Sequence, residues 1–345
     1  KSIRLRKRFL KEHERKRAEM GHPLAPAGRG FQLETRTAGM AGLLNPMTHR
    51  RAVALMVLVA LLWSIAGVVT RHLESAASFE VTFWRSAFNA LALVVLLSWL
   101  RGPTVLAQSL RRGGRALWLS GVCWAVMYTA FMVAITLTTV ANVLVTMAVA
   151  PLFTALAARL ALGHRLPSRT WAAIVVAGLG IGWMYGRDVS GAGAQHVLGV
   201  AVALAVPVAA AVNWTLIQAL RAPGRGGEPP DMLAAVLLGA LLSAAGTWPF
   251  ALQFAASAHD LGLLALLGVV QLAIPCLVAV TAAKVLSAPE VSLLALLEVV
   301  FGVAWAWLGA GEAPSPAVLL GGGVVLLALA AHEAAGLRQP KVVPT

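Results

Sequence analysis

The chain has 345 residues, of which 59% are apolar and 12% are charged, and its formal net charge is +14. Soluble globular domains are about 45–50% apolar and roughly 25% charged, so this composition excludes an ordinary soluble enzyme, a disordered chain and a disulfide-rich scaffold. Cys123 and Cys276 both lie in apolar runs, which predicts neither a disulfide framework nor a cysteine metal site. The sequence therefore predicts an integral membrane protein with several spans.

Residues 1–51 form a basic tail before the first apolar run. They hold 13 of the 28 Lys and Arg residues but only 4 of the 14 Asp and Glu residues. No folded basic module accompanies this charge, so we interpret the tail as a cytoplasmic segment beside anionic lipid and predict no binding of nucleic acid. Met40 and Met47 would both be natural starts, which leaves open whether residues 1–46 belong to the natural protein.

Ten apolar runs follow the tail, each near the length of about 20 residues that a membrane helix needs. Because the runs are apolar throughout, they predict helices and not the alternating strands of a membrane barrel. The predicted spans are 52–70, 81–99, 116–136, 139–161, 169–186, 197–220, 232–253, 260–281, 288–309 and 316–334.

Loop charges predict the orientation of these spans. With the N-terminus placed in the cytoplasm, twelve Lys and Arg residues of short loops fall inside, among them Arg111 and Arg165. Only Arg71 and Arg187 fall outside. Cytoplasmic loops are enriched in Lys and Arg, so the alternation predicts ten spans with both termini in the cytoplasm, the C-terminal tail being residues 335–345.

A weak internal repeat relates the two halves of the chain. Residues 138–164 align without a gap on residues 286–312, with five identical positions. Each copy contains the fourth of five spans, and because five is odd the second copy must enter the membrane from the opposite side. The sequence therefore predicts an all-α membrane protein in which residues 52–186 and 197–334 are two inverted five-helix repeats, an arrangement typical of transporters.

Short motifs lie in both halves, and the one that begins at Ala150 in the first half is repeated from Leu297 in the second with similar order and spacing. They are Trp63 with Ser64 and Gly67, Phe83-Trp84-Arg85, Ala150-Pro151-Leu152-Phe153-Thr154 followed by Leu162-Gly163, and Leu297-Glu298-Val299-Val300-Phe301 followed by Gly311-Glu312. In these motifs the chain resembles the drug/metabolite transporter superfamily in its EamA-like branch, over about residues 52–334. Two positions depart from the pattern: His164 stands where the family has glutamate, and Val299 stands where it usually has proline.

The resemblance implies a carrier for a small metabolite or drug, usually an exporter, in the bacterial cytoplasmic membrane. We therefore expect efflux by alternating access, with a small-molecule substrate and the lipid bilayer as partners and with no cofactor. Coupling to protons and assembly as a homodimer are left open. A lipid or lipid-linked-sugar flippase is the alternative within transport, and a membrane-embedded enzyme is the alternative outside it.

No enzyme motif is present in the sequence. HExxH, GxSxG, Walker A and paired-cysteine zinc patterns are all missing, so neither a catalytic site nor a metal site is predicted.

Ionisable residues inside the spans are candidates for the transport site, because a charge in the bilayer is costly. Glu298 lies in the middle of the ninth span, and it is either a proton carrier or a neutral acid that bonds helices together. No Lys or Arg is expected at the same depth. Arg85 lies four residues inside the second span, where it either attracts an anionic group or anchors the helix by snorkelling to the interface. Lys284 and Glu290 are expected to pair at the turn between the eighth and ninth spans.

Uncharged side chains supply the remaining candidates for substrate contact: Trp63, Ser64, Trp124, Tyr128, Asn142, Asn213, Trp214 and Gln271. Aromatic faces can stack on a cation or a ring, and amides can bond either a substrate or a neighbouring helix. Pro151 and Pro207 interrupt helices and act as hinges or as simple bends. Gly178, Gly182 and Gly186 recur every four residues, which predicts close helix packing.

Overall fold

The structure is a computed structural model, and it describes residues 47–76, 78–163, 194–221, 231–252 and 254–337, together with seven separate positions between 164 and 193. Every regular element in these ranges is helical. Helices suit apolar runs because they satisfy their backbone hydrogen bonds internally, whereas the hydrocarbon of a bilayer offers no partners. The predicted all-α class is therefore confirmed for the described residues.

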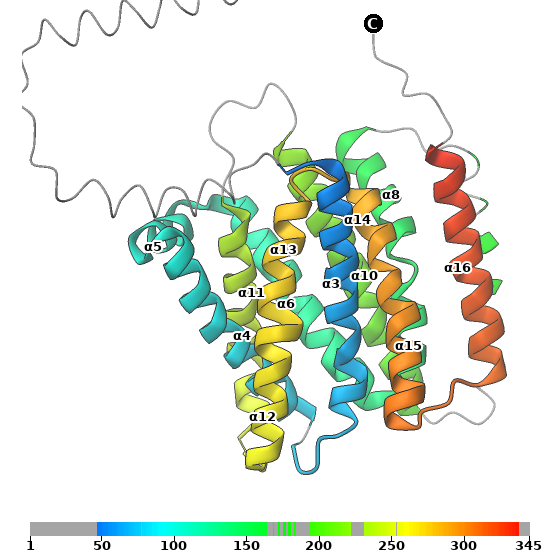
Figure 1. Ribbon diagram of the computed structural model, residues 1–345, viewed down its shortest axis with the longest axis horizontal. Helices are drawn as coiled ribbons and strands as arrows, with labels where there is room; N and C mark the ends of the chain where they lie inside the picture. Colours follow the sequence, from blue (N-terminus) through cyan, green and yellow to red (C-terminus); the bar gives the residue numbers. More distant parts are fainter. Residues whose placement is uncertain are drawn as a thin grey trace, which may run out of the picture. The chain divides into compact units, whose positions relative to one another are not determined.

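The helices of both halves pack into a bundle (Figure 1). The first half contains α3 (His49–Thr70), α4 (Ser78–Arg101), α5 (Pro103–Arg112), α6 (Gly114–Leu137), α7 (Val140–Met147) and α8 (Ala150–Leu162). The second half contains α10 (Ala194–Leu220), α11 (Met232–Thr247), η1 (Trp248–Phe250), α12 (Ala258–Leu266), η2 (Leu267–Ala273), α13 (Ile274–Ala282), α14 (Ala288–Ala295), α15 (Leu297–Ala310) and α16 (Pro316–Leu337).

Eight helical segments in the described ranges are long and apolar enough to cross a membrane. They coincide with the first four predicted spans and with the sixth to the ninth. The tenth predicted span coincides with α16, which has a shorter apolar stretch over Pro316–Ala328. The fifth, residues 169–186, lies mostly outside the described residues, and so do Gly178, Gly182 and Gly186. The total of ten therefore stays a prediction.

α5 is a short helix that the sequence analysis did not predict. It follows α4 after a single residue, Gly102, and only Leu106 of its ten residues is buried. Arg111 and Arg112 form its last turn. A helix this short cannot span a bilayer, and its combination of apolar and basic side chains suits the membrane interface.

The course of α3 defines two ends of the bundle, which we name the His49 end and the Arg71 end after the residues where α3 begins and stops (Figure 1). An ion pair between His49 Nε2 and Glu290 Oε1, at 3.1 Å, lies at the His49 end. Glu290 also accepts hydrogen bonds from the backbone and side chain of Ser287, so it caps α14. The prediction that Glu290 pairs with Lys284 is therefore wrong, because the carboxylate of Glu290 bonds to Ser287 and His49.

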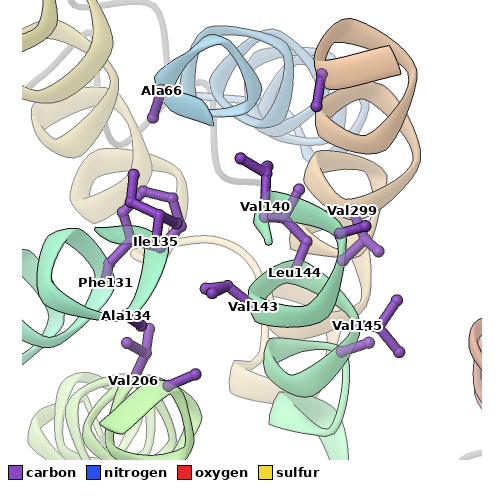
Figure 2. Packing of buried hydrophobic residues seen from close by; sticks show 14 of the residues in the cluster. Ala66, Phe131, Ala134, Ile135, Val140, Val143, Leu144, Val145, Val206 and Val299 are labelled. Atoms are coloured by element: carbon purple, nitrogen blue, oxygen red, sulfur yellow. The ribbon is translucent and has the colours of Figure 1, made fainter. Parts of the chain in front are cut away.

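α7 lies at the centre of the apolar core. Its side chains Val140, Val143, Leu144 and Val145 are each at most 3% exposed. Lipid tails are as apolar as these side chains, so close packing stabilises the contacts more than removal from water does. Figure 2 shows the neighbours: Ala66 of α3, Phe131, Ala134 and Ile135 of α6, Val206 of α10, and Val299 of α15.

The fourth and ninth predicted spans are each broken into two helices, and the breaks match. A shift of 148 residues, which aligns the two sequences, maps α7 onto α14 residue for residue. Each copy starts at a hydroxyl side chain, Thr139 or Ser287, which accepts a hydrogen bond from the backbone three residues later. Each copy ends at a glycine in the left-handed conformation, Gly163 or Gly311, which other residues adopt at a cost.

The same shift also relates two contacts between the broken helices. A contact from α7 to α15 corresponds to a contact from α14 to α8. Leu144 of α7 packs against Gly302 of α15, where a Cβ atom would lie 2.5 Å from Leu144 Cδ1. The equivalent positions are Ser292 of α14 and Thr154 of α8, whose hydroxyl oxygens lie 2.8 Å apart. Contacts that exchange partners in this way are expected where a two-fold axis relates two copies.

Replacement of Gly302 tests this crossing. Gly302→Val would force its side chain into Leu144, so we expect a loss of about 1–3 kcal/mol of stability, measured as thermal unfolding in detergent. Gly323→Val is the matched control, because a Cβ at Gly323 of α16 would meet no atom within 4 Å. Equal thermal stability of the two variants would contradict the close crossing.

Candidate functional site

An internal cavity of about 110 Å³ lies beside the breaks in both long helices. Its walls come from both halves of the chain. The first half contributes α3, α4, α6, α7 and α8, and the second half contributes α10, η2, α13, α14 and α15. Most lining side chains are apolar or aromatic. The polar ones are Arg85, Tyr128, Gln271, Cys276, Ser292 and Glu298.

Arg85 is held in the cavity wall by polar partners inside the bundle. Its Nη2 and Nε atoms both donate to Gln271 Oε1, at 3.0 and 3.3 Å, and Nη1 donates to the carbonyl oxygen of Tyr128 at 3.4 Å. The guanidinium carbon also lies 5.7 Å from the centre of the Phe131 ring. Arg85 is only 2% exposed, so the expectation that it snorkels to the interface is wrong.

Gln271 reaches Arg85 from a π-helical turn, η2. The N–H of Ile274 donates to the carbonyl of Val269, five residues earlier, so one extra residue is accommodated in this turn. Gln271 also donates from Nε2 to the carbonyl oxygen of Trp63 at 3.1 Å. One amide side chain therefore connects α3 and α4 across the cavity.

A glycine allows η2 to lie this close to α4. A Cβ at Gly268 would lie 2.8 Å from the carbonyl oxygen of Arg85 and from the backbone nitrogen of Asn89. Distances this short exclude any side chain at Gly268, so the separation of the two backbones depends on this residue. This backbone contact sets the position of Gln271 along α4, next to Arg85.

Glu298 is the acidic residue of the cavity wall. It lies in the first turn of α15, directly after the break at Leu296, and is 9% exposed. Free N–H groups at the start of a helix favour a negative charge. Within the described ranges, its carboxylate makes no ion pair and no hydrogen bond. Arg85 lines the same cavity, so the expectation that no Lys or Arg shares the depth of Glu298 is wrong.

Aromatic side chains form the broadest part of the cavity wall. The ring of Trp124 lies 5.5 Å from that of Tyr128 and 5.7 Å from that of Trp214, the second pair edge to face. Trp63 completes this group from α3. Among the residues that the structure describes, Trp124 Nε1 and the Tyr128 hydroxyl are buried without a partner at hydrogen-bond geometry. They are donors that a bound solute could use.

Three predicted site residues lie elsewhere. Ser64 donates to the carbonyl of Leu61 within its own helix. Asn142 contacts Thr138 and His196 near the Arg71 end, and Asn213 accepts a hydrogen bond of 2.6 Å from Ser120 between α10 and α6. These short polar side chains bond neighbouring backbone and helices, which is the alternative role that the sequence analysis left open, and none of the three lines the cavity.

The two prolines differ in their setting. Pro151 lies at the start of α8, directly after the break, and Pro207 lies inside α10 and lines the cavity. Phe131, Cys276 and Ser292 also line the cavity, and no pattern in the sequence pointed to them. Each lies close in sequence to a predicted one, but only the helix rotation decides which face meets the cavity.

The chemistry of this cavity suits binding. One fixed cation, one unpaired acid and several aromatic faces surround a small volume, which is an arrangement for holding a solute. In the described ranges there is no group of three His, Cys, Asp or Glu residues that could hold a metal ion. Nothing in the described cavity wall favours the flippase or the enzyme alternative.

Comparisons with known proteins bear on the family of the first half and on the fold of most of the chain. The model of the EamA-like transporter family matches residues 50–186, which covers the first predicted repeat. No curated protein matches the chain. Nineteen chains of solved structures do. One of them, titled only "Crystal structure of protein", is 18% identical, covers 85% of this chain and 100% of its own length, and has a TM-score of 0.59. At this identity the likeness shows the fold alone.

The bond between Gln271 and Arg85 is testable by stability. Gln271→Leu leaves a buried guanidinium without its main acceptor, so we expect a loss of about 1–3 kcal/mol in thermal unfolding. The double variant Gln271→Leu/Arg85→Met removes both partners and should recover most of this loss. A double variant no more stable than the single one would show that the two side chains do not depend on each other.

Proposed function

Since residues 50–186 are a segment of the EamA-like transporter family and the chain is a multi-pass membrane protein, we propose that it moves a small organic metabolite or drug outward by alternating access. The observation that carries this proposal is the internal cavity. Its walls come from both halves of the chain, so movement of one half against the other would expose it to either side in turn.

Two inverted repeats would supply this movement. The matched ends of α7 and α14, the paired glycines Gly163 and Gly311, and the exchanged contacts of Leu144 and Ser292 all support a two-fold relation between the halves. Breaks in the middle of membrane helices are typical of carriers, because unwound backbone is tolerated where it borders a cavity. Here both breaks border the same cavity.

The lining residues suggest the class of solute. Aromatic faces favour an apolar or aromatic body, and Arg85 and Glu298 favour a polar or charged group on it.

The orientation that we propose follows from loop charges. The His49 end carries Arg101, Arg111, Arg112 and Arg115 near the ends of α4, α5 and α6. Short loops rich in arginine stay in the cytoplasm, so the His49 end is the cytoplasmic one and the Arg71 end faces outward.

Cysteine labelling tests this orientation. With native cysteines replaced, Arg111→Cys and Arg165→Cys should react with an impermeant thiol reagent only after the membrane is opened, whereas Arg187→Cys should react in intact cells. Reaction of position 165 from outside would contradict the inverted-repeat topology, because that topology puts the loop between the fourth and fifth predicted spans in the cytoplasm.

Glu298 is the residue that we propose for coupling to protons. Its carboxylate has no partner in the described part of the cavity and would be costly to bury as an ion, so a proton can neutralise it when the cavity is closed. Arg85 keeps its charge because Gln271 and Tyr128 accept its hydrogen bonds. The acid is therefore the adjustable charge of the site and the arginine is the fixed one.

Glu298→Gln tests this role in vesicles that hold purified protein. The variant keeps the shape of the side chain but cannot titrate, so we expect accumulation driven by a proton gradient to fall at least about tenfold while solute exchange persists. Glu290→Gln is the control, because Glu290 lies at the His49 end and does not line the cavity. If Glu298→Gln accumulates solute like the parent from acidic to mildly alkaline pH, the residue is a packing element.

A further inference from the structure

The Arg71 end of the bundle is closed by an ion pair that joins the two halves. Arg71 Nε donates to Glu312 Oε2 at 2.8 Å, so the end of α3 is bound to the second residue after α15. The arginine also donates from Nη1 to the carbonyl of Ile135 at 3.0 Å and from Nη2 to that of Thr138 at 3.1 Å. One guanidinium therefore ties α3 to the turn between α6 and α7.

Glu312 completes the closure from the second half. Its other oxygen, Oε1, accepts a hydrogen bond of 2.6 Å from the backbone N–H of Val140, the first residue of α7. The side chains of Arg71 and Glu312 are only 31% and 17% exposed, so the pair is partly shielded from water. Four helix ends, those of α3, α6, α7 and α15, meet at these two side chains.

The His49 end has a matching set of contacts. Arg221, at the end of α10, donates from Nη2 to the carbonyl of Leu286 at 2.9 Å. Gln218 Oε1 accepts from the backbone N–H of Ala288, the first residue of α14, at 2.8 Å. Leu286 and Ala288 lie 148 residues after Thr138 and Val140, the shift that relates the two repeats.

The two sets differ in charge and in what they join. At the Arg71 end a carboxylate of the second half binds residues of the first half. At the His49 end the acceptor is a neutral amide, and Gln218, Arg221, Leu286 and Ala288 all belong to the second half. Among the described residues, no carboxylate lies within 4 Å of the Arg221 side chain. Movement of the halves against each other must break the first set and can leave the second intact.

Other contacts join the two halves at the His49 end. They are the contact between His49 and Glu290 and the salt bridge between Arg101 and Asp231. Each end of the bundle is therefore closed by its own side chains.

Building on the proposed function, we propose that Arg71 and Glu312 form the outer gate of the carrier. Their bonds join the two halves at the Arg71 end, so they must break before the cavity can open there, whereas the contacts at the His49 end can stay in place. Opening at the outer end therefore requires the loss of this ion pair.

Labelling of a cavity residue tests the gate without any substrate. Ala210→Cys, which lines the cavity, is placed in a background of Cys123→Ala and Cys276→Ala and reacted with an impermeant charged thiol reagent in right-side-out and inside-out vesicles. Glu312→Gln keeps the acceptor for Val140 but removes the charge. We expect it to raise the reaction rate from outside about two- to fivefold, the range for a partly exposed ion pair.

Two further variants make the result specific. Arg71→Gln should give the same increase, and the double variant Arg71→Gln/Glu312→Gln should add little to either, because the two side chains act as a pair. Glu74→Gln, an exposed carboxylate at the same end, is the matched control and should leave the rate unchanged. Unchanged labelling from outside in both Glu312→Gln and Arg71→Gln, or an equal increase in Glu74→Gln, overturns the gate.

The outcome separates the gate from the carrier function. If labelling is unchanged while vesicles still accumulate solute, the carrier stands and the gate is wrong. If the gate variants raise labelling while no solute is moved by the parent, the ion pair controls access to a cavity with another use. Thermal unfolding of each variant in detergent confirms that the labelled protein is folded.

Discussion

The crossing of the two broken helices is the contact on which the rest of the structure depends. At Leu144 and Gly302, and again at Thr154 and Ser292, α7–α8 and α14–α15 touch in the middle of the bundle. A helix that breaks at this depth leaves backbone groups that lipid cannot satisfy, so other helices must surround the breaks. That requirement encloses the cavity and brings residues from both halves into its wall.

The cavity wall then contains two ionisable side chains, Arg85 and Glu298, and they differ in the hydrogen bonds that hold them. Arg85 is bound by Gln271, by the Tyr128 carbonyl and by the Phe131 ring, and a buried guanidinium with acceptors stays charged. Glu298 has the start of α15 beside it but no side-chain partner within the described ranges. Water or a cation entering the cavity would therefore change the state of the acid first, whereas the arginine supplies a constant field for any solute.

Sequence patterns predicted the composition of this site better than its geometry. Apolar runs and loop charges placed eight spans that the structure also has, and seven of the ten proposed contact residues, including Trp124 and Gln271, line one cavity. Hydropathy carries no information on helix rotation or on breaks, so it could not separate Ser64, Asn142 and Asn213, which lie outside the cavity wall, from the residues that line it, and the interruption at Leu296 was not foreseen. The burial of Arg85 depends on Gln271, 186 residues away, and no local pattern reports such a partner.

The π-helical turn at η2 has a consequence for how this site could change between relatives. A π-turn is an α-helix with one residue inserted, and each residue advances a helix by about 100°. Deletion of Val269 or Val270, neither of which lines the cavity, would restore regular winding and rotate Gln271 away from Arg85 by about that angle, while every wall residue kept its identity. Solute preference in this fold can therefore diverge through a change of helix register, without any substitution in the cavity.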